Sequence, residues 1–496
     1  MSNLSKAMRT TSSALILAAL LSASVLAGAS TDTTKKTAAA APVKPTTAAK
    51  PGASTGTGTG AAHGAGASGP SANHPTANGP TTHGPVTGGG EAIHSTSTTA
   101  HITPRGVTER RTPNGSAVLT RPGGGVRDVH DAGRGMDIHH GLNGGHRVMV
   151  ERADHSRTLF QRGRPGYVQR PYAFRGHDFA RRTYFYHDHV YSHFYHGYAY
   201  RGMYLNVYAP GFYYRPAYYG WAYNPWVTPV HYQWGFAASP WYGYYGYYFA
   251  PYPAYPSASY WLTDYMISSD LQQAYAAHTE AGEVDGSAPA VGGPAELTPE
   301  VKQQIADEVK NQLALENQEA QQDAQQQDVS PASSGIDRML SDAAQSRQHV
   351  FVVGAALDVV DASQTECALS DGDVLALQTA PPAGATTANL VVLASKGGQE
   401  CQPRGTVTVA MDDLQEMQNH IRETIDHGLQ ELQAQQGKGG LPAVPPSAQA
   451  QPAPAQYAAI APPDDPNAAA EIQQQAQQGD QAEKEVNAEA APGGGF

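Results

Sequence analysis

Four histidines occur within one short aromatic stretch of the sequence, at His187, His189, His193 and His196. On a β-strand His187, His189 and His193 share one face, and on a helix His189 and His193 are one turn apart. Either arrangement brings imidazoles close enough to bind Zn²⁺ or Cu²⁺. The alternative is that histidine serves as one more flat, hydrogen-bonding ring in an aromatic strand. No His-Glu-x-x-His motif accompanies the cluster, so no catalytic metal is predicted.

Aromatic side chains are concentrated in the same region. Of 27 tyrosines 26 lie between Tyr167 and Tyr275, together with all five tryptophans. The segment 219–226 is echoed by 232–241, and each unit has the form of an aromatic strand followed by a proline corner. These rings either stack on one another or present flat faces to sugars and surfaces. The candidate stacking residues are Tyr219, Trp221, Trp226, Trp234 and Trp241.

Charge is distributed unevenly along the chain. Residues 101–201 contain 16 arginines and eight acidic residues, whereas residues 276–496 contain nine basic and 32 acidic residues. An arginine excess favours anionic partners such as envelope polysaccharide, with Arg170, Arg175, Arg181, Arg182 and Arg201 as candidate contacts. The alternative is a solvated sheet face, or one that balances the acidic segment. No nucleic-acid-binding motif occurs, so nucleic acid is not an expected partner.

No nucleophile, base and orienting residue can be grouped from the sequence, and the chain is predicted to be non-enzymatic. The two cysteines, Cys367 and Cys401, lie in the segment that most resembles a globular domain. An oxidising compartment would let them form a disulfide, whereas two buried thiols are the alternative.

The N-terminus has the pattern of an export signal. Lys6 and Arg9 precede an apolar run from Ala14 to Leu26, and a small-residue cleavage site follows. We therefore predict a signal peptide over 1–29 and a periplasmic or extracellular location, with no membrane span after cleavage. Residues 30–105 are rich in Thr, Ala, Gly and Pro, and are predicted to be a disordered linker.

The remaining chain divides by composition. Alternating runs and Gly-rich turns predict a β-meander, with the aromatic repeats completing a β region over 106–275. A linker at 276–297 leads to an isolated helix at 298–325, which Thr298 caps with Pro299 at the first helical position. This helix has a narrow apolar stripe that favours docking or self-association, and a second linker follows at 326–335.

Residues 336–436 are predicted to form a small α+β domain, a β-barrel or sandwich with a C-terminal helix. Asp413 and Glu416 have the spacing of a capping box that starts this helix. The Pro/Ala/Gln-rich segment 437–496 is predicted to be a disordered tail.

Several segments resemble a group of uncharacterised secreted bacterial proteins. They are 219–226 (Tyr-Gly-Trp-Ala-Tyr-Asn-Pro-Trp), 241–249, 259–265, 367–374 and 412–417. The resemblance covers about half the chain and implies secretion but no activity.

Together these observations predict a mostly β protein with long disordered segments. The expected function is that of an exported structural or interaction protein. It would bind an anionic or glycan surface through its Arg- and aromatic-rich β region, and a histidine metal module is the alternative.

Overall fold

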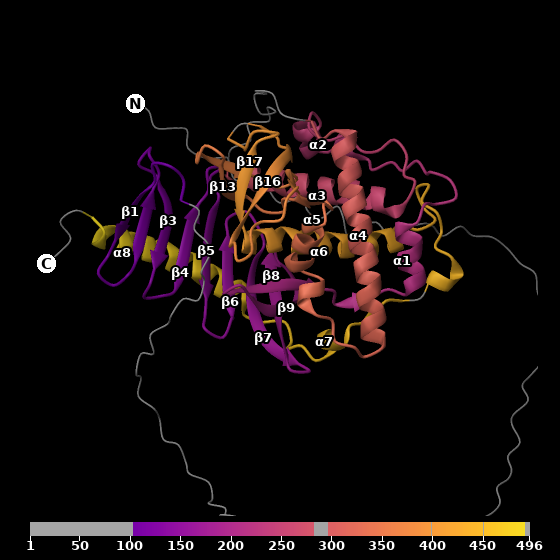
Figure 1. The fold of residues 1–496 in the computed structure, drawn as a ribbon, viewed down its shortest axis with the longest axis horizontal. Coiled ribbons are helices and arrows are strands. Elements are labelled where there is room, and N and C mark those ends of the chain that lie inside the picture. The colour runs from indigo at the N-terminus through magenta and orange to yellow at the C-terminus, as the bar shows by residue number, and fades with distance from the viewer. Residues whose placement is uncertain (1–102, 282–295, 398, 450, 492–496) are drawn as a thin grey trace, which may run out of the picture. The chain divides into compact units, whose positions relative to one another are not determined.

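Ten consecutive antiparallel strands form the first sheet, in which each strand pairs with its neighbour in sequence (Figure 1). The computed structural model describes residues 103–281, 296–397, 399–449 and 451–491, all within one unit, Thr87–Phe496. The strands are β1 (Thr108–Arg111), β2 (Ala117–Thr120), β3 (Val126–Asp131), β4 (Met136–His140), β5 (His146–Glu151), β6 (Arg157–Gln161), β7 (Gly166–Phe174), β8 (His177–Tyr186), β9 (His189–Tyr200) and β10 (Met203–Ala209).

The predicted β-meander is confirmed. In β3 every second residue is buried, which is the pattern of a strand with one covered face. The turns before β2 and β5 contain Gly115 and Gly144, whose φ angles are +94° and +73°. Only glycine adopts such angles without steric cost, which explains the Gly-rich turns of the sequence.

The predicted disordered tail is wrong for most of 437–496. This segment contains η4 (Pro446–Ala448), β18 (Ala453–Pro454), α7 (Gln456–Ala459) and α8 (Ala468–Glu489). The helix α8 crosses strands β2 to β8, and its Ala482 and Val486 pack with Val118 and Val148 of the sheet. At Gly479 an added Cβ would lie 2.6 Å from Val148, so glycine permits the close approach. Since the sheet supplies the large apolar side chains, the helix needs few of its own.

The second sheet has six strands in the order β12-β15-β16-β17-β13-β14. The strands are β12 (His349–Val352), β13 (Leu357–Asp361), β14 (Glu366–Leu369), β15 (Val374–Leu377), β16 (Thr387–Ala394) and β17 (Thr406–Ala410). The flanking helices are α5 (Ile336–Ala344), preceded by η3 (Pro331–Ser333), and α6 (Met411–Gln435). The core of this region includes Met203 and Leu205 of β10, so the segment does not pack independently of the first sheet.

The predicted capping box at the start of α6 is wrong. The N-cap residue is Ala410, without a side-chain cap, and Asp412 and Asp413 lie in the first turn. Glu416 instead pairs with Arg182 of the first sheet. A long-range ion pair has replaced the local hydrogen bond that the spacing predicts.

The aromatic repeats form helices rather than strands. The elements are β11 (Phe212–Tyr213), α1 (Pro216–Tyr223), η2 (Phe236–Ala238), α2 (Pro240–Tyr245) and α3 (Ala258–Ala281). Pro216 and Pro240 start α1 and α2, because proline fits the first turn of a helix, where its missing N–H is not needed. Pro240 of the second unit therefore marks a helix start, whereas Pro225 of the first unit follows the end of α1.

The helix α4 (Pro299–Ala324) begins where the sequence predicts. Thr298 Oγ1 accepts a hydrogen bond from the backbone N–H of Val301 at 3.3 Å. The helix is not isolated, however, because Ile305, Val309 and Leu313 are buried in the core that α1, α3 and α6 share. The predicted signal peptide, residues 30–102 of the first predicted linker and residues 282–295 of the linker predicted at 276–297 lie outside the described residues.

Candidate functional site

Two adjoining cavities lie between the first sheet and the helix α6. The larger has a volume of about 300 Å³ and is lined by β5 to β9, α3, α6 and the loop 354–357. The smaller has a volume of about 150 Å³ and lies over β3 to β5. They share Arg147, Arg164 and Asp413, so the lining is continuous.

Most charged groups of the larger cavity are paired with one another. The pairs are Glu416 with Arg182 (2.7 Å), Glu151 with Arg157 (2.9 Å), Asp270 with His420 (2.9 Å) and Glu423 with His193 (3.4 Å). Arg164 pairs with Asp371, which lies in the turn between β14 and β15 of the second sheet. Such pairing offsets the cost of removing charges from water.

Asp412 and Asp413 are exceptions to this pairing. None of the ion pairs within the described ranges includes either carboxylate, although the charge of Arg147 favours the ionised form of both, that of Arg157 the ionised form of Asp412, and that of His139 the ionised form of Asp413. Burial raises the pKa of both groups, and the charge of Asp412 helps to raise that of Asp413 to about 7. Within the described part of the chain, Oδ1 of Asp412 is buried without a hydrogen-bond partner. The cavity therefore holds an acidic pair without a direct ion-pair partner among the described residues, near Arg147 of the same lining.

A second network surrounds Glu423 on α6. Burial alone would raise the pKa of Glu423, but His193 and a hydrogen bond from Tyr195 outweigh it and lower the pKa to about 2. The hydroxyls of Tyr195 and Tyr184 are 2.7 Å apart. Beside them, Nε2 of His193 lies 3.3 Å from Nε2 of His427.

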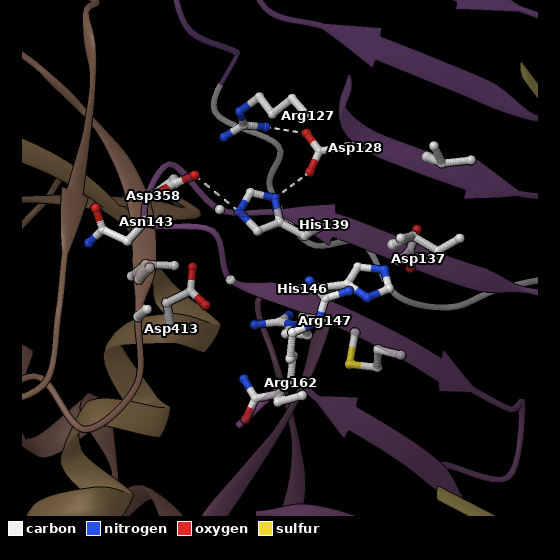
Figure 2. A pocket seen from close by; sticks show the side chains of 18 of the residues that line it. Arg127, Asp128, Asp137, His139, Asn143, His146, Arg147, Arg162, Asp358 and Asp413 are labelled. Carbon is white, nitrogen blue, oxygen red and sulfur yellow. Dashed lines mark hydrogen bonds and ion pairs between the residues drawn. The ribbon is translucent and has the colours of Figure 1, made fainter. Parts of the chain in front are cut away.

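The smaller cavity lies between the two sheets, and residues of its lining connect them. Figure 2 shows His139 of β4 between Asp128 of β3 and Asp358 of β13, with nitrogen–oxygen distances of 2.6 and 3.2 Å. Asp358 also accepts a hydrogen bond from Arg121 at 2.8 Å and one from the backbone N–H of Leu142 at 3.0 Å. Although burial opposes it, the two carboxylates raise the pKa of His139. Asp358 therefore fastens the second sheet to the first.

The predicted surface arginines are largely engaged within the protein. Arg170 pairs with Asp465 and Glu471, both at 2.7 Å, and Arg181 pairs with Asp464. Arg182 is only 2% exposed and stacks on Tyr195 at 3.9 Å. These contacts favour the alternative interpretation, in which the basic sheet balances the acidic C-terminal segments.

The other two predicted arginines are exposed residues of β-turns. Arg175 bonds to the backbone oxygen of Gln326 at 2.8 Å, and Arg201 bonds to that of Ala385 at 3.4 Å.

The predicted stacking surface is not an exposed face. Tyr219, Trp226 and Trp241 are buried, and Trp221 and Trp234 are half-buried against the same core. The rings pack on one another, as in the stacked pair of Trp234 with Trp261 of α3 at 4.8 Å. Of the two interpretations of the repeat, self-stacking is the one that the structure supports.

The four histidines of the predicted metal module are dispersed. His187 lies in a turn and contacts Glu280 at 2.7 Å, while His189 is exposed. His193 faces the larger cavity, and His196 is buried against Phe179. His193 and His196 are three residues apart on β9, and an odd spacing along a strand places two side chains on opposite faces of the sheet. These four residues do not form a shared metal site.

The predicted disulfide between Cys367 and Cys401 is present, and no helix in the described ranges is long and apolar enough to cross a bilayer. Sequence reasoning missed the Asp412–Asp413 pair as a site, because two acids at a helix start are ordinarily favourable to the helix dipole. Their burial arises from contacts with strands far away in sequence. Searches of family models, curated proteins and solved structures found no match to this chain.

Proposed function

We propose that this chain is an exported, non-enzymatic binding protein whose larger cavity takes a small organic cation. The observation that carries the proposal is the half-buried pair Asp412 and Asp413, which lines the cavity and takes part in no ion pair among the described residues. A cation placed there would supply the missing counter-charge in a low-dielectric environment.

The cavity walls suit an organic cation. Tyr167, Tyr184 and Tyr191 contribute rings to the lining, and aromatic faces attract ammonium groups. A volume of about 300 Å³ is within the range of small-molecule sites. The arginines of the lining, among them Arg147, provide donors for polar groups elsewhere on the ligand. These features favour a ligand that carries an amine and several oxygen atoms.

This proposal differs from binding to an anionic envelope surface. Such binding would compete with the contacts that Arg170 and Arg181 already make to acidic residues of the C-terminal segment. The Cys367–Cys401 disulfide supports export, because disulfides persist in oxidising compartments. A periplasmic or extracellular location is thus part of the proposal.

Isothermal titration calorimetry on the full chain tests the proposal. The probes are choline, spermidine, lysine and a matched set of small anions at constant ionic strength. We expect at least one organic cation to bind and the D412N/D413N variant to bind it at least tenfold more weakly. The control variant D307N/E431Q removes two exposed helical carboxylates and should bind as the wild type does.

Binding of anions alone would contradict the proposal, as would absence of binding by every cation. Equal affinity in D412N/D413N and the control would show that the cation binds elsewhere. Circular dichroism of each variant verifies that the fold is retained.

A further inference from the structure

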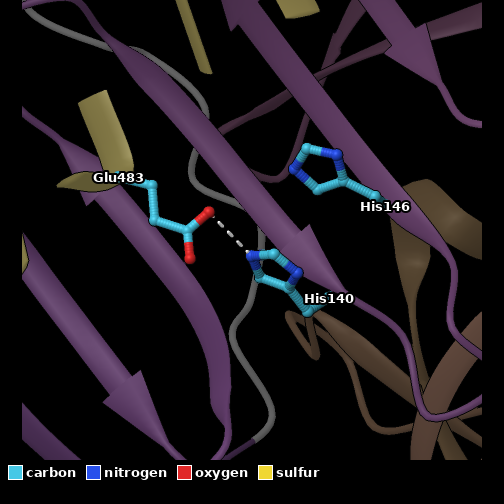
Figure 3. Close-up of side chains that lie close together, drawn as sticks. All are labelled: His140, His146 and Glu483. Atoms are coloured by element: carbon cyan, nitrogen blue, oxygen red, sulfur yellow. Dashed lines mark hydrogen bonds and ion pairs between the residues drawn. The ribbon is translucent and has the colours of Figure 1, made fainter. Parts of the chain in front are cut away.

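A second cluster of metal-ligating side chains lies where α8 crosses the first sheet. It consists of His140 at the end of β4, His146 at the start of β5 and Glu483 of α8. Figure 3 shows the Glu483 carboxylate directed at the His140 ring, with the His146 ring beside them. One potential ligand atom from each residue lies within 4.8 Å of the others.

The β4–β5 hairpin sets the positions of the two histidines. His140 and His146 are cross-strand partners on either side of a Gly-rich turn, and their rings stack at 4.8 Å between centroids. Their spacing in the sequence is too wide for a short metal-binding motif. Pairing of the strands brings them together, which is why the sequence does not reveal the site.

The His146 side chain has an unused ligand atom. This residue is only 5% exposed, yet its Nε2 has no hydrogen-bond partner among the described residues. Buried polar atoms are ordinarily satisfied, so an unpartnered imidazole nitrogen indicates a missing ligand.

The ligand set defines the kind of ion. Two imidazoles and one carboxylate match the ligands of Zn²⁺, which binds at about 2.0–2.2 Å and leaves ligand atoms roughly 3.4 Å apart in a tetrahedron. Nε2 of His140 and Oε2 of Glu483 are already 3.0 Å apart. A small movement of His146 would complete three corners, with water at the fourth.

We propose that His140, His146 and Glu483 bind Zn²⁺ and that the ion fastens the C-terminal helix α8 to the β4–β5 hairpin. None of the three residues lines the larger cavity, which is the one proposed to bind an organic cation, although His146 lines the smaller cavity beside it, and the metal site does not depend on the proposed function. Its effect is structural, because the ion joins two segments that are more than 330 residues apart in sequence.

Zinc titration of the metal-free full chain tests this site. We expect the H140Q/H146Q variant to bind one Zn²⁺ fewer per chain than the control H189Q/H231Q, which removes two exposed histidines. The milder variant E483Q keeps both imidazoles and should bind that ion at least about tenfold more weakly, since even outer-shell changes cost 10–100-fold.

Hydrogen exchange of residues 468–489 provides a second readout. Zinc should slow exchange in the wild type and in the control but not in H140Q/H146Q. Equal zinc stoichiometry in the two double variants would overturn the proposal, as would zinc-independent exchange in the wild type. Wild-type circular dichroism spectra in each variant verify that the change is local.

Discussion

Replacing Asp413 with asparagine should stabilise the protein, and increasingly so as the pH rises. The folded protein raises the pKa of this carboxyl from 3.8 to about 7, because the group is buried and close to Asp412. Ionised Asp413 is therefore less favourable in the folded state than in the unfolded chain. Its contribution to stability is fully present below about pH 4 and is lost as the pH rises through 7.

The size of the effect follows from the pKa. A rise from 3.8 to about 7 corresponds to about 4 kcal/mol at about 1.4 kcal/mol per tenfold change in proton affinity. Asp412 shares the repulsion, so we expect the asparagine variant to recover roughly half of this, about 2 kcal/mol above pH 7. Below pH 4 the gain should vanish, because the wild-type carboxyl is then protonated in both states.

Urea unfolding of wild type and D413N between pH 4 and 8, with the disulfide intact, measures this difference. D307N is the control, since it removes an exposed carboxylate on α4. A difference that does not change with pH would refute the reasoning, as would a D413N variant that is less stable than wild type at pH 8.

Three further predictions concern other contacts. G479A should lower the free energy of unfolding by about 1–3 kcal/mol, because the new methyl group meets Val148 at 2.6 Å. A rise in the free energy of unfolding, as expected for an exposed helical glycine replaced by alanine, would contradict this close packing. D358N should lower the free energy of unfolding by about 3 kcal/mol, because it breaks the buried contacts of Asp358 with Arg121 and His139. An unchanged midpoint in urea unfolding would contradict the role of Asp358 in holding the two sheets together. Glu423 has a pKa of about 2, so its stabilising contribution should be lost as the pH falls from 4.5 towards 2. An E423Q variant that unfolds in acid at the same pH as wild type would show that Glu423 makes no such contribution.

The fold was predictable where local patterns decide it. Period-two burial and turn glycines such as Gly115 identify the meander, and Thr298 with Pro299 marks the start of α4. These signals depend only on residues close together in the sequence, so distant contacts do not override them and the predicted elements form. The Cys367–Cys401 pair was predictable for a different reason, because two cysteines permit only one internal disulfide.

Long-range packing decides the features that sequence reasoning missed. The composition of α8 is typical of a disordered tail, but Val148 and other sheet residues supply the apolar surface it needs. Trp226 and Trp241 have the composition of an adhesive surface, yet the helices around them cover their rings. Asp413 has the spacing of a helix cap, and only the fold, which places it in the cavity wall beside distant strands, reveals it as a half-buried acid.

The central claim, that a cation neutralises the Asp412–Asp413 pair, is tested most directly by proton release on binding. Calorimetric titration at pH 7 in buffers of different ionisation enthalpy measures the protons released per cation bound. Because the bound cation would lower the pKa of Asp413 from about 7, we predict release of roughly half a proton from wild type and almost none from D413N. Cation binding without proton release, or equal release from both proteins, would contradict this account.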